Sequence, residues 1–73
     1  MMKMKFHGSY PHLQKCVYAC NTFGDWYWLS VGRLFQFRSI DGEILNWWPS
    51  TGTVSFQGRP GPLKARFCAM FAN

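Results

Sequence analysis

The sequence predicts an α+β fold, in which a small antiparallel sheet of three to four strands has a C-terminal helix packed on one face. The chain has 73 residues, which is room for one domain. Hydrophobic residues make up 48% of it and aromatic residues 19%, a composition typical of a packed core. Short runs of alternating polarity, separated by turn residues, fill its middle. We expect a single domain over residues 1–73, with residues 1–9 as a candidate flexible arm.

The first regular element is expected at residues 11–20. Pro11 suits the first position of a helix, and the sequence from Asn21 to Gly24 suits the exit from one. A helix is favoured here, although residues 16–20 would also suit a strand.

A meander of strands is expected in the middle of the chain. Its strands cover residues 25–30, 34–39, 43–48 and 53–58. Val31 and Gly32 can form the first turn, and one long bent strand over both flanking segments is the alternative. Asp41 and Gly42 predict a hairpin. Residues 49–52 predict a further turn into the last strand.

A C-terminal helix is expected from Pro62, which follows a break rich in glycine and proline. Four apolar residues recur with helical spacing and predict its buried stripe: Leu63, Phe67, Met70 and Phe71. Lys64 lies away from this stripe and Arg66 lies near its edge, so the helix would hold its charge outward.

Alternation along the strands assigns side chains to two faces of the sheet. On the last strand, Val54 and Phe56 share the face that the helix must cover. The polar alternates point the other way: Thr53, Ser55 and Gln57. Trp47 and Trp48 are neighbours, so each face carries one tryptophan. The chain has more aromatic residues than one face can hide, and some rings must therefore stay exposed.

The charge distribution suits an anionic partner. The formal net charge is +5 and the sequence pI is about 9.5. All acidic residues fall within residues 25–43, whereas both ends of the chain are purely basic. Nucleic acid is the commonest partner for such a chain. The alternative is that the dispersed cations only make the surface soluble.

The sequence gives no sign of export, membrane insertion or a disulfide framework. Its N-terminus lacks the apolar run of a signal peptide, and charges interrupt every apolar stretch, so we expect a cytoplasmic protein with no membrane partner. Three cysteines, Cys16, Cys20 and Cys68, are an odd number and suit reduced thiols. A zinc site from Cys16, Cys20 and His12 with Cys68 or His7 is the open alternative. Otherwise no cofactor is expected.

Catalytic motifs are also missing from the sequence. Three acidic residues are few for carboxylate chemistry, and no phosphate-binding loop, nucleophile elbow or HExxH metal motif occurs. Cys16 and His12 could pair on a helix, but no third group is identifiable to orient them. We therefore expect a protein that is not an enzyme.

Residues 43–58 read EILNWWPSTGTVSFQG, an aromatic strand, a Ser-Thr-Gly turn and a strand ending in Gln-Gly before a helix. This run resembles part of the TATA-binding-protein-like N-terminal substrate-binding domain of type 3 ribonucleases H. The resemblance implies a curved sheet that grips nucleic acid, with a contact strip of Trp47, Trp48, Ser50, Thr53, Ser55 and Gln57. Pro49 and Thr51 depart from the family pattern around the turn. No catalytic domain accompanies the run, so ribonuclease activity is not implied.

Together these features predict a non-enzymatic module that binds DNA or RNA through a sheet face and basic flanks. The flanks add Arg38, Arg59, Lys64 and Arg66 to the contact strip. The alternative is a small inhibitor or adaptor of the kind found in phage or mobile elements. Such a protein would bind a host protein through Trp26, Trp28, Trp47 or Trp48. A homodimer would use the same surplus of apolar surface.

Overall fold

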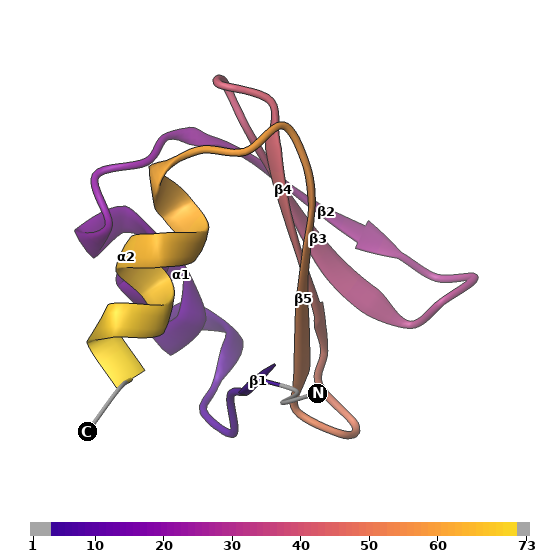
Figure 1. The fold of residues 1–73 in the computed structure, drawn as a ribbon. Coiled ribbons are helices and arrows are strands. Elements are labelled where there is room, and N and C mark those ends of the chain that lie inside the picture. The colour runs from indigo at the N-terminus through magenta and orange to yellow at the C-terminus, as the bar shows by residue number, and fades with distance from the viewer. Residues whose placement is uncertain (1–3, 72–73) are drawn as a thin grey trace.

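Two helices lie on the same side of a five-stranded antiparallel sheet in a computed structural model, which describes residues 4–71 (Figure 1). The elements, in chain order, are β1 (Met4–Lys5), α1 (Tyr10–Ala19), β2 (Gly24–Leu29), β3 (Leu34–Ser39), β4 (Glu43–Trp48), β5 (Thr53–Gly58) and α2 (Pro62–Phe71). The order of strands across the sheet is β1-β5-β4-β3-β2, and every neighbouring pair is antiparallel. The predicted α+β class is confirmed.

The sheet has five strands rather than the three to four expected, because the sequence did not predict β1. Met4 pairs with Val54 and Lys5 with Thr53, which places β1 at the edge beside β5. Phe6 follows it into the core with 4% of its surface exposed. The expected arm is therefore part of the fold from Met4 onward, and residues 1–3 lie outside the described residues. A two-residue strand is too short to show any alternation of polarity.

The helix α2 begins at Pro62, as the sequence predicts, and α1 begins at Tyr10, one residue before its expected start. Pro11 lies in the first turn of α1, and the Ser9 hydroxyl accepts a hydrogen bond from the His12 backbone N–H at 3.2 Å. The strand alternative for residues 16–20 is wrong. In α2, Leu63 and Phe67 are fully buried, but Met70 is 42% exposed, so the buried stripe is narrower than predicted. Neither helix of residues 4–71 has the length and apolar run needed to cross a membrane.

The predicted turns connect the meander. Residues 30–33 join β2 to β3 as a hairpin, so the alternative of a single bent strand is wrong. Gly42 and Gly52 adopt φ angles of 91° and 79°, which glycine tolerates best. The Gly52 N–H donates to the Trp48 carbonyl at 2.7 Å and closes the turn between β4 and β5. The strands β3, β4 and β5 have the predicted bounds, and β2 lies one residue earlier than predicted.

The core lies between the helices and one face of the sheet, here called the helix-covered face. Its buried members are Phe6, Leu13, Cys16, Val17, Cys20, Phe37, Leu45, Trp47, Val54, Leu63 and Phe67. Aromatic contacts join the two layers, as between Phe56 and Phe67, whose ring centroids are 5.9 Å apart. Each fully buried side chain of this kind contributes about 1.5–3 kcal/mol to folding. The predicted assignment of Val54 and Phe56 to this side is confirmed.

Candidate functional site

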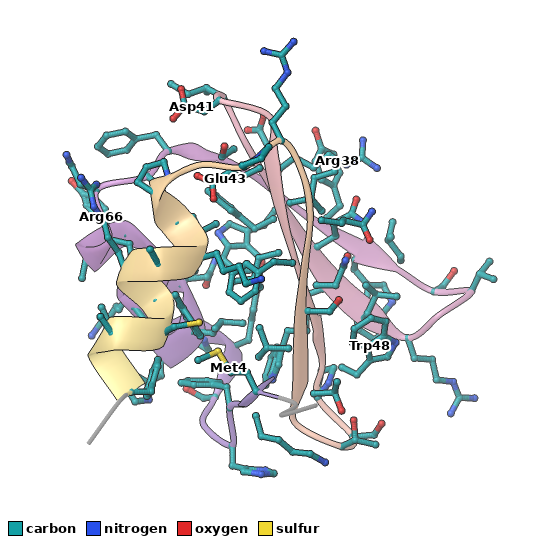
Figure 2. The ribbon with its side chains drawn as sticks, viewed as in Figure 1. Met4, Arg38, Asp41, Glu43, Trp48 and Arg66 are labelled. Atoms are coloured by element: carbon teal, nitrogen blue, oxygen red, sulfur yellow. The ribbon has the colours of Figure 1, made fainter. Side chains whose placement is uncertain are left out.

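The opposite face of the sheet has no helix over it (Figure 1) and is here called the open face. Alternation and strand register assign to it Lys5, Asp25, Tyr27, Leu29, Leu34, Gln36, Arg38, Ile44, Asn46, Trp48, Thr53, Ser55 and Gln57. Figure 2 shows Arg38 and Trp48 on this side, away from the helices. Its composition is mixed, with charges, amides, hydroxyls and rings side by side.

A chain of side-chain hydrogen bonds crosses the open face from β3 to β5. The Arg38 Nε donates to Gln36 Oε1 at 2.7 Å, and Gln36 Nε2 donates to Asn46 Oδ1 at 2.8 Å. Asn46 Nδ2 then donates to Gln57 Oε1 at 3.0 Å and to Ser55 Oγ at 3.4 Å. Gln36 is only 8% exposed and Asn46 only 3%. These amides are shielded by their neighbours on the sheet, and each satisfies the other.

Arg38 determines the direction of this chain. A guanidinium only donates hydrogen bonds, so Gln36 must turn its oxygen toward Arg38 and its nitrogen toward Asn46. The same logic passes through Asn46 to Gln57. Among the hydrogen bonds of residues 4–71, the Arg38 Nη groups and Gln57 Nε2 have no partner. Both ends of the chain therefore present free donors.

Rings and charge flank the hydrogen-bonded amides. The Arg38 guanidinium carbon lies 4.6 Å from the centroid of the Tyr27 ring, a cation–π contact. Tyr27 is 41% exposed, and Trp48 is partly exposed at the other end of the face. Lys5 and Arg38 against Asp25 give the face a net positive charge. A flat anionic or aromatic group would meet both donors and rings here.

Five of the residues predicted as contacts lie on the open face: Arg38, Trp48, Thr53, Ser55 and Gln57. Ser50 is exposed in the turn that ends the face between β4 and β5. Arg59 follows β5 directly, and its aliphatic carbons lie against Gly42 in the turn between β3 and β4. The structure thus brings most of the predicted contact strip to one side of the sheet.

Three of the predicted contacts lie elsewhere. Trp47 is 3% exposed on the helix-covered face, where its Nε1 donates to the Phe6 carbonyl at 3.0 Å. Lys64 is exposed on α2 in the helix layer. Arg66, also on α2, donates from Nη1 to the Cys20 carbonyl at 3.0 Å and so ties the two helices together (Figure 2). A strand alternates faces and a helix covers only one, so these residues do not share a surface with Trp48.

Sequence reasoning did not include Gln36, Asn46 or Tyr27 among the contacts. The alternation of side chains along the strands places these residues on the same face as Arg38 and Gln57, and this pattern could have identified them from the sequence. Their contact with one another depends on the register of three strand pairs, with Gln36 opposite Asn46 and Asn46 opposite Ser55. That register is a property of the folded sheet.

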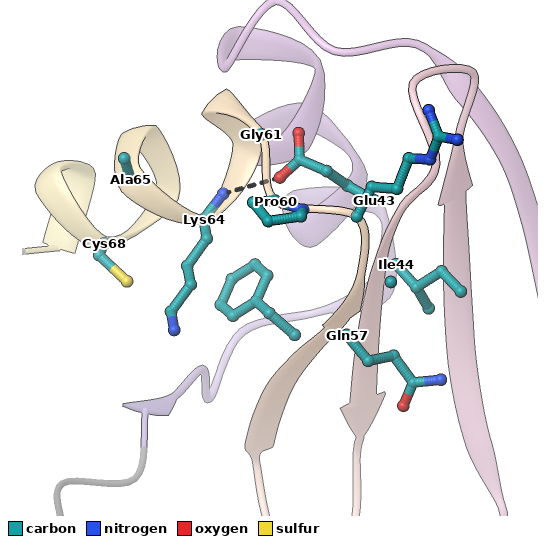
Figure 3. Close-up of a pocket in the computed structure, with 11 residues that line it drawn as sticks. Glu43, Ile44, Gln57, Pro60, Gly61, Lys64, Ala65 and Cys68 are labelled. Carbon is teal, nitrogen blue, oxygen red and sulfur yellow. Dashed lines mark hydrogen bonds between the residues drawn. The ribbon is translucent and has the colours of Figure 1, made fainter.

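A pocket of about 550 Å³ lies between β5 and the start of α2 (Figure 3). Glu43, 3% exposed, sits at its inner end, where its carboxylate accepts hydrogen bonds from the N–H groups of Leu63 at 3.0 Å and Lys64 at 3.3 Å. Glu43 therefore caps α2 from a distant strand, in place of a local N-cap residue. The carboxylate therefore already occupies the helix N-terminus that this pocket reaches.

The cysteines lie mainly in the core. Burial raises the pKa of the Cys16 and Cys20 thiols, with the neighbouring Cys16 adding to the effect on Cys20. Within residues 4–71, no three His, Cys, Asp or Glu side chains gather closely enough to hold a metal ion.

No protein-family model, no curated protein and no solved structure matches this chain.

Proposed function

We propose that the protein is a non-enzymatic module that binds nucleic acid through the open face. The observation that carries the proposal is the direction of the hydrogen-bond chain from Arg38 to Gln57, which leaves donors at both ends. A matching ligand must offer acceptors. Phosphate oxygens, base carbonyls and base ring nitrogens are acceptors of this kind.

The remaining features of the open face support the same class of ligand. The exposed Tyr27 and the partly exposed Trp48 offer rings on which bases stack, worth about 1–3 kcal/mol for each base. The net charge of +5 favours a polyanion over a neutral partner. The resemblance of residues 43–58 to a substrate-binding domain of type 3 ribonucleases H points to the same class of ligand, with Trp47 omitted from the contacts.

The first test is a titration with labelled single-stranded DNA, double-stranded DNA, RNA and hybrid oligonucleotides at two salt concentrations. Binding should weaken steeply with salt, because each phosphate contact releases a counterion. Arg38→Gln should lower the affinity and reduce the slope of log K against log salt by about one unit. Lys64→Gln is the matched control, because it removes the same charge from the helix layer and should leave the affinity nearly unchanged.

Tryptophan fluorescence identifies the face that is used. The fluorescence of the protein should be quenched on binding if a base stacks on Trp48, and Trp48→Phe should remove most of that quenching. The absence of binding by all four oligonucleotides at low salt would contradict the proposal. Equal loss of affinity in Arg38→Gln and Lys64→Gln would contradict the assignment to the open face.

A second candidate function is binding to a host protein through exposed rings. It is favoured by Tyr18 and Phe23, which are 63% and 51% exposed and pack edge to face with centroids 5.7 Å apart. Among the four tryptophans first considered as anchors, Trp28 is the exposed one, at 51%. A hydrophobic interface of this kind would respond only weakly to salt, which separates it from nucleic-acid binding.

A further inference from the structure

Strand β2 forms an edge of the sheet that lacks the usual protection. Among residues 4–71 it is the last strand in the order and pairs only with β3. Natural edge strands are kept from pairing by lysines, prolines, bulges or short length. β2 has six residues in unbroken register, with Asp25 as its one charge and no proline or lysine. The opposite edge, β1, has two residues in the described chain, one of them Lys5.

The outer edge of β2 has backbone N–H and C=O groups that an additional strand could pair with. The Ile40 N–H donates to the Phe23 carbonyl at 2.9 Å, which makes this a hydrogen-bonded pair. Such pairs alternate along an antiparallel ladder, so the N–H and C=O groups of Trp26 and Trp28 point to the free edge. An extended partner strand would satisfy them, as in β-strand addition.

We propose that this partner is β2 of a second copy, paired antiparallel about a two-fold axis so that two five-stranded sheets join into one. With Tyr27 on the axis, Trp26 of each copy lies opposite Trp28 of the other copy, so the interface contains two such pairs. These are the residues whose backbone groups point outward. Cross-strand aromatic pairs stabilise sheets, and Asp25 falls opposite Leu29 rather than another charge. The sequence of β2 is therefore complementary to itself.

A small dimer interface at this edge would use a modest share of the protein surface. Specific interfaces of the smaller kind bury about 600 Å² on each partner. The chain exposes 5016 Å² in total, so such an interface needs about an eighth of it. The edge supplies a six-residue backbone and two rings, Tyr27 at 41% and Trp28 at 51% exposure. A whole aromatic side chain buries roughly 150–250 Å², so these two half-exposed rings together supply about that area and the backbone and neighbouring side chains must supply the rest.

The test is the molar mass of the purified protein, measured by light scattering and sedimentation over roughly a hundredfold range of concentration. The proposal expects a mass that rises to twice 8.5 kDa. Trp28→Lys places a charge on the edge and should keep the protein monomeric. Ile40→Lys is the matched control, because Ile40 is 78% exposed but lies in the turn after β3, and it should dimerise normally.

Hydrogen exchange of the wild-type protein provides a second measurement that does not depend on a variant folding. The amides of Trp26 and Trp28 should exchange more slowly as the concentration rises, whereas those of β5 should not change. A wild-type mass of one chain at every concentration would overturn the proposal. Dimerisation of a folded Trp28→Lys variant, or exchange of the β2 amides that is independent of concentration, would also overturn it.

Discussion

The two faces of the sheet are made by the same strands and differ in how their side chains are buried and hydrogen-bonded. On the helix-covered face, Leu45, Trp47 and Val54 are buried by the two helices. On the open face, Asn46 is as deeply buried as Trp47, at 3% exposure each, although no helix covers it. The helices bury mainly apolar groups, with Glu43 satisfied by the N–H groups of α2, whereas burial by neighbours within the sheet accepts polar groups that bond to one another. One face therefore contributes mainly to stability, and the other keeps its polar groups and rings accessible at the surface of the sheet.

Adjacent tryptophans provide the sharpest test of this difference. Trp47→Ala should destabilise the domain by about 3–5 kcal/mol, because it leaves a large cavity and removes the hydrogen bond to Phe6. Trp48→Ala, on the open face, should cost much less. Urea denaturation followed by circular dichroism measures both. Equal losses of unfolding free energy in the two variants would show that Trp48 stabilises the domain as much as Trp47 does, contrary to this difference between the faces.

The next largest effect is expected at Glu43, the charged residue of the helix-covered face. Glu43→Ala removes the acceptor of two N–H groups at the start of α2 and should cost about 1–3 kcal/mol. Glu43→Gln keeps one oxygen for the Leu63 N–H and should lose less. The same denaturation experiment measures both variants. A Glu43→Gln variant as unstable as Glu43→Ala would indicate that the charge, rather than the hydrogen bond, caps the helix.

On the open face, Asn46→Asp should reverse the outer end of the hydrogen-bond chain. An aspartate only accepts, so Gln57 would turn its nitrogen inward and present its oxygen to the ligand. The added negative charge acts in the same direction. Nucleic-acid affinity should fall at least about tenfold, or about 1.4 kcal/mol, in the oligonucleotide titration.

Gln14→Glu is the control for this variant, because it adds the same negative charge on α1, in the helix layer. Its affinity should stay close to that of the wild type. An unchanged affinity in a folded Asn46→Asp variant would contradict the role given to the direction of the chain.

The smallest effect is a decline of stability at alkaline pH that comes from the helix-covered side. Burial raises the pKa of Cys16 and Cys20 above the ordinary value of 9.0, so the folded state holds these protons more tightly than the unfolded state. Their contribution is complete below about pH 9 and is lost as the pH rises through the folded pKa values. Urea midpoints at neutral and alkaline pH should show the decline. The double variant Cys16→Ala, Cys20→Ala should flatten it, and an identical decline would assign it to other groups.

Local signals in the sequence were sufficient for most of the fold. Pro11 and Pro62 mark helix starts, Asp41-Gly42 marks a hairpin, and alternation separates Val54 from Ser55. These signals act within a few residues, and so they can be read without knowing the fold. β1 was missed because its two residues become a strand only by pairing with β5, which lies 50 residues away (Met4 with Val54). The buried stripe of α2 was predicted to include Met70 and Phe71, which are exposed. Helical spacing shows which residues share a side of the helix, but not how far along the helix that side is covered by the rest of the protein.

The candidate site was less predictable than the fold. Arg38, Ser55 and Gln57 were expected as contacts and do share the open face. The resemblance implied Trp47 as a contact, although its neighbour Trp48 necessarily faces the other way. Asn46 and Gln36 were not expected, because an amide in a strand gives no local sign of its partners. Their role depends on which residues the sheet register places opposite them.

The sequence by itself determined the order of elements, the turns and the two-faced character of each strand, because these follow from backbone preferences and side-chain polarity at short range. Tertiary structure decided that β1 pairs with β5, that Glu43 caps α2 from β4, and that amides from three strands join into one chain. Each of these contacts joins residues at least 10 positions apart in the sequence. Only packing and strand register bring such residues within hydrogen-bonding distance.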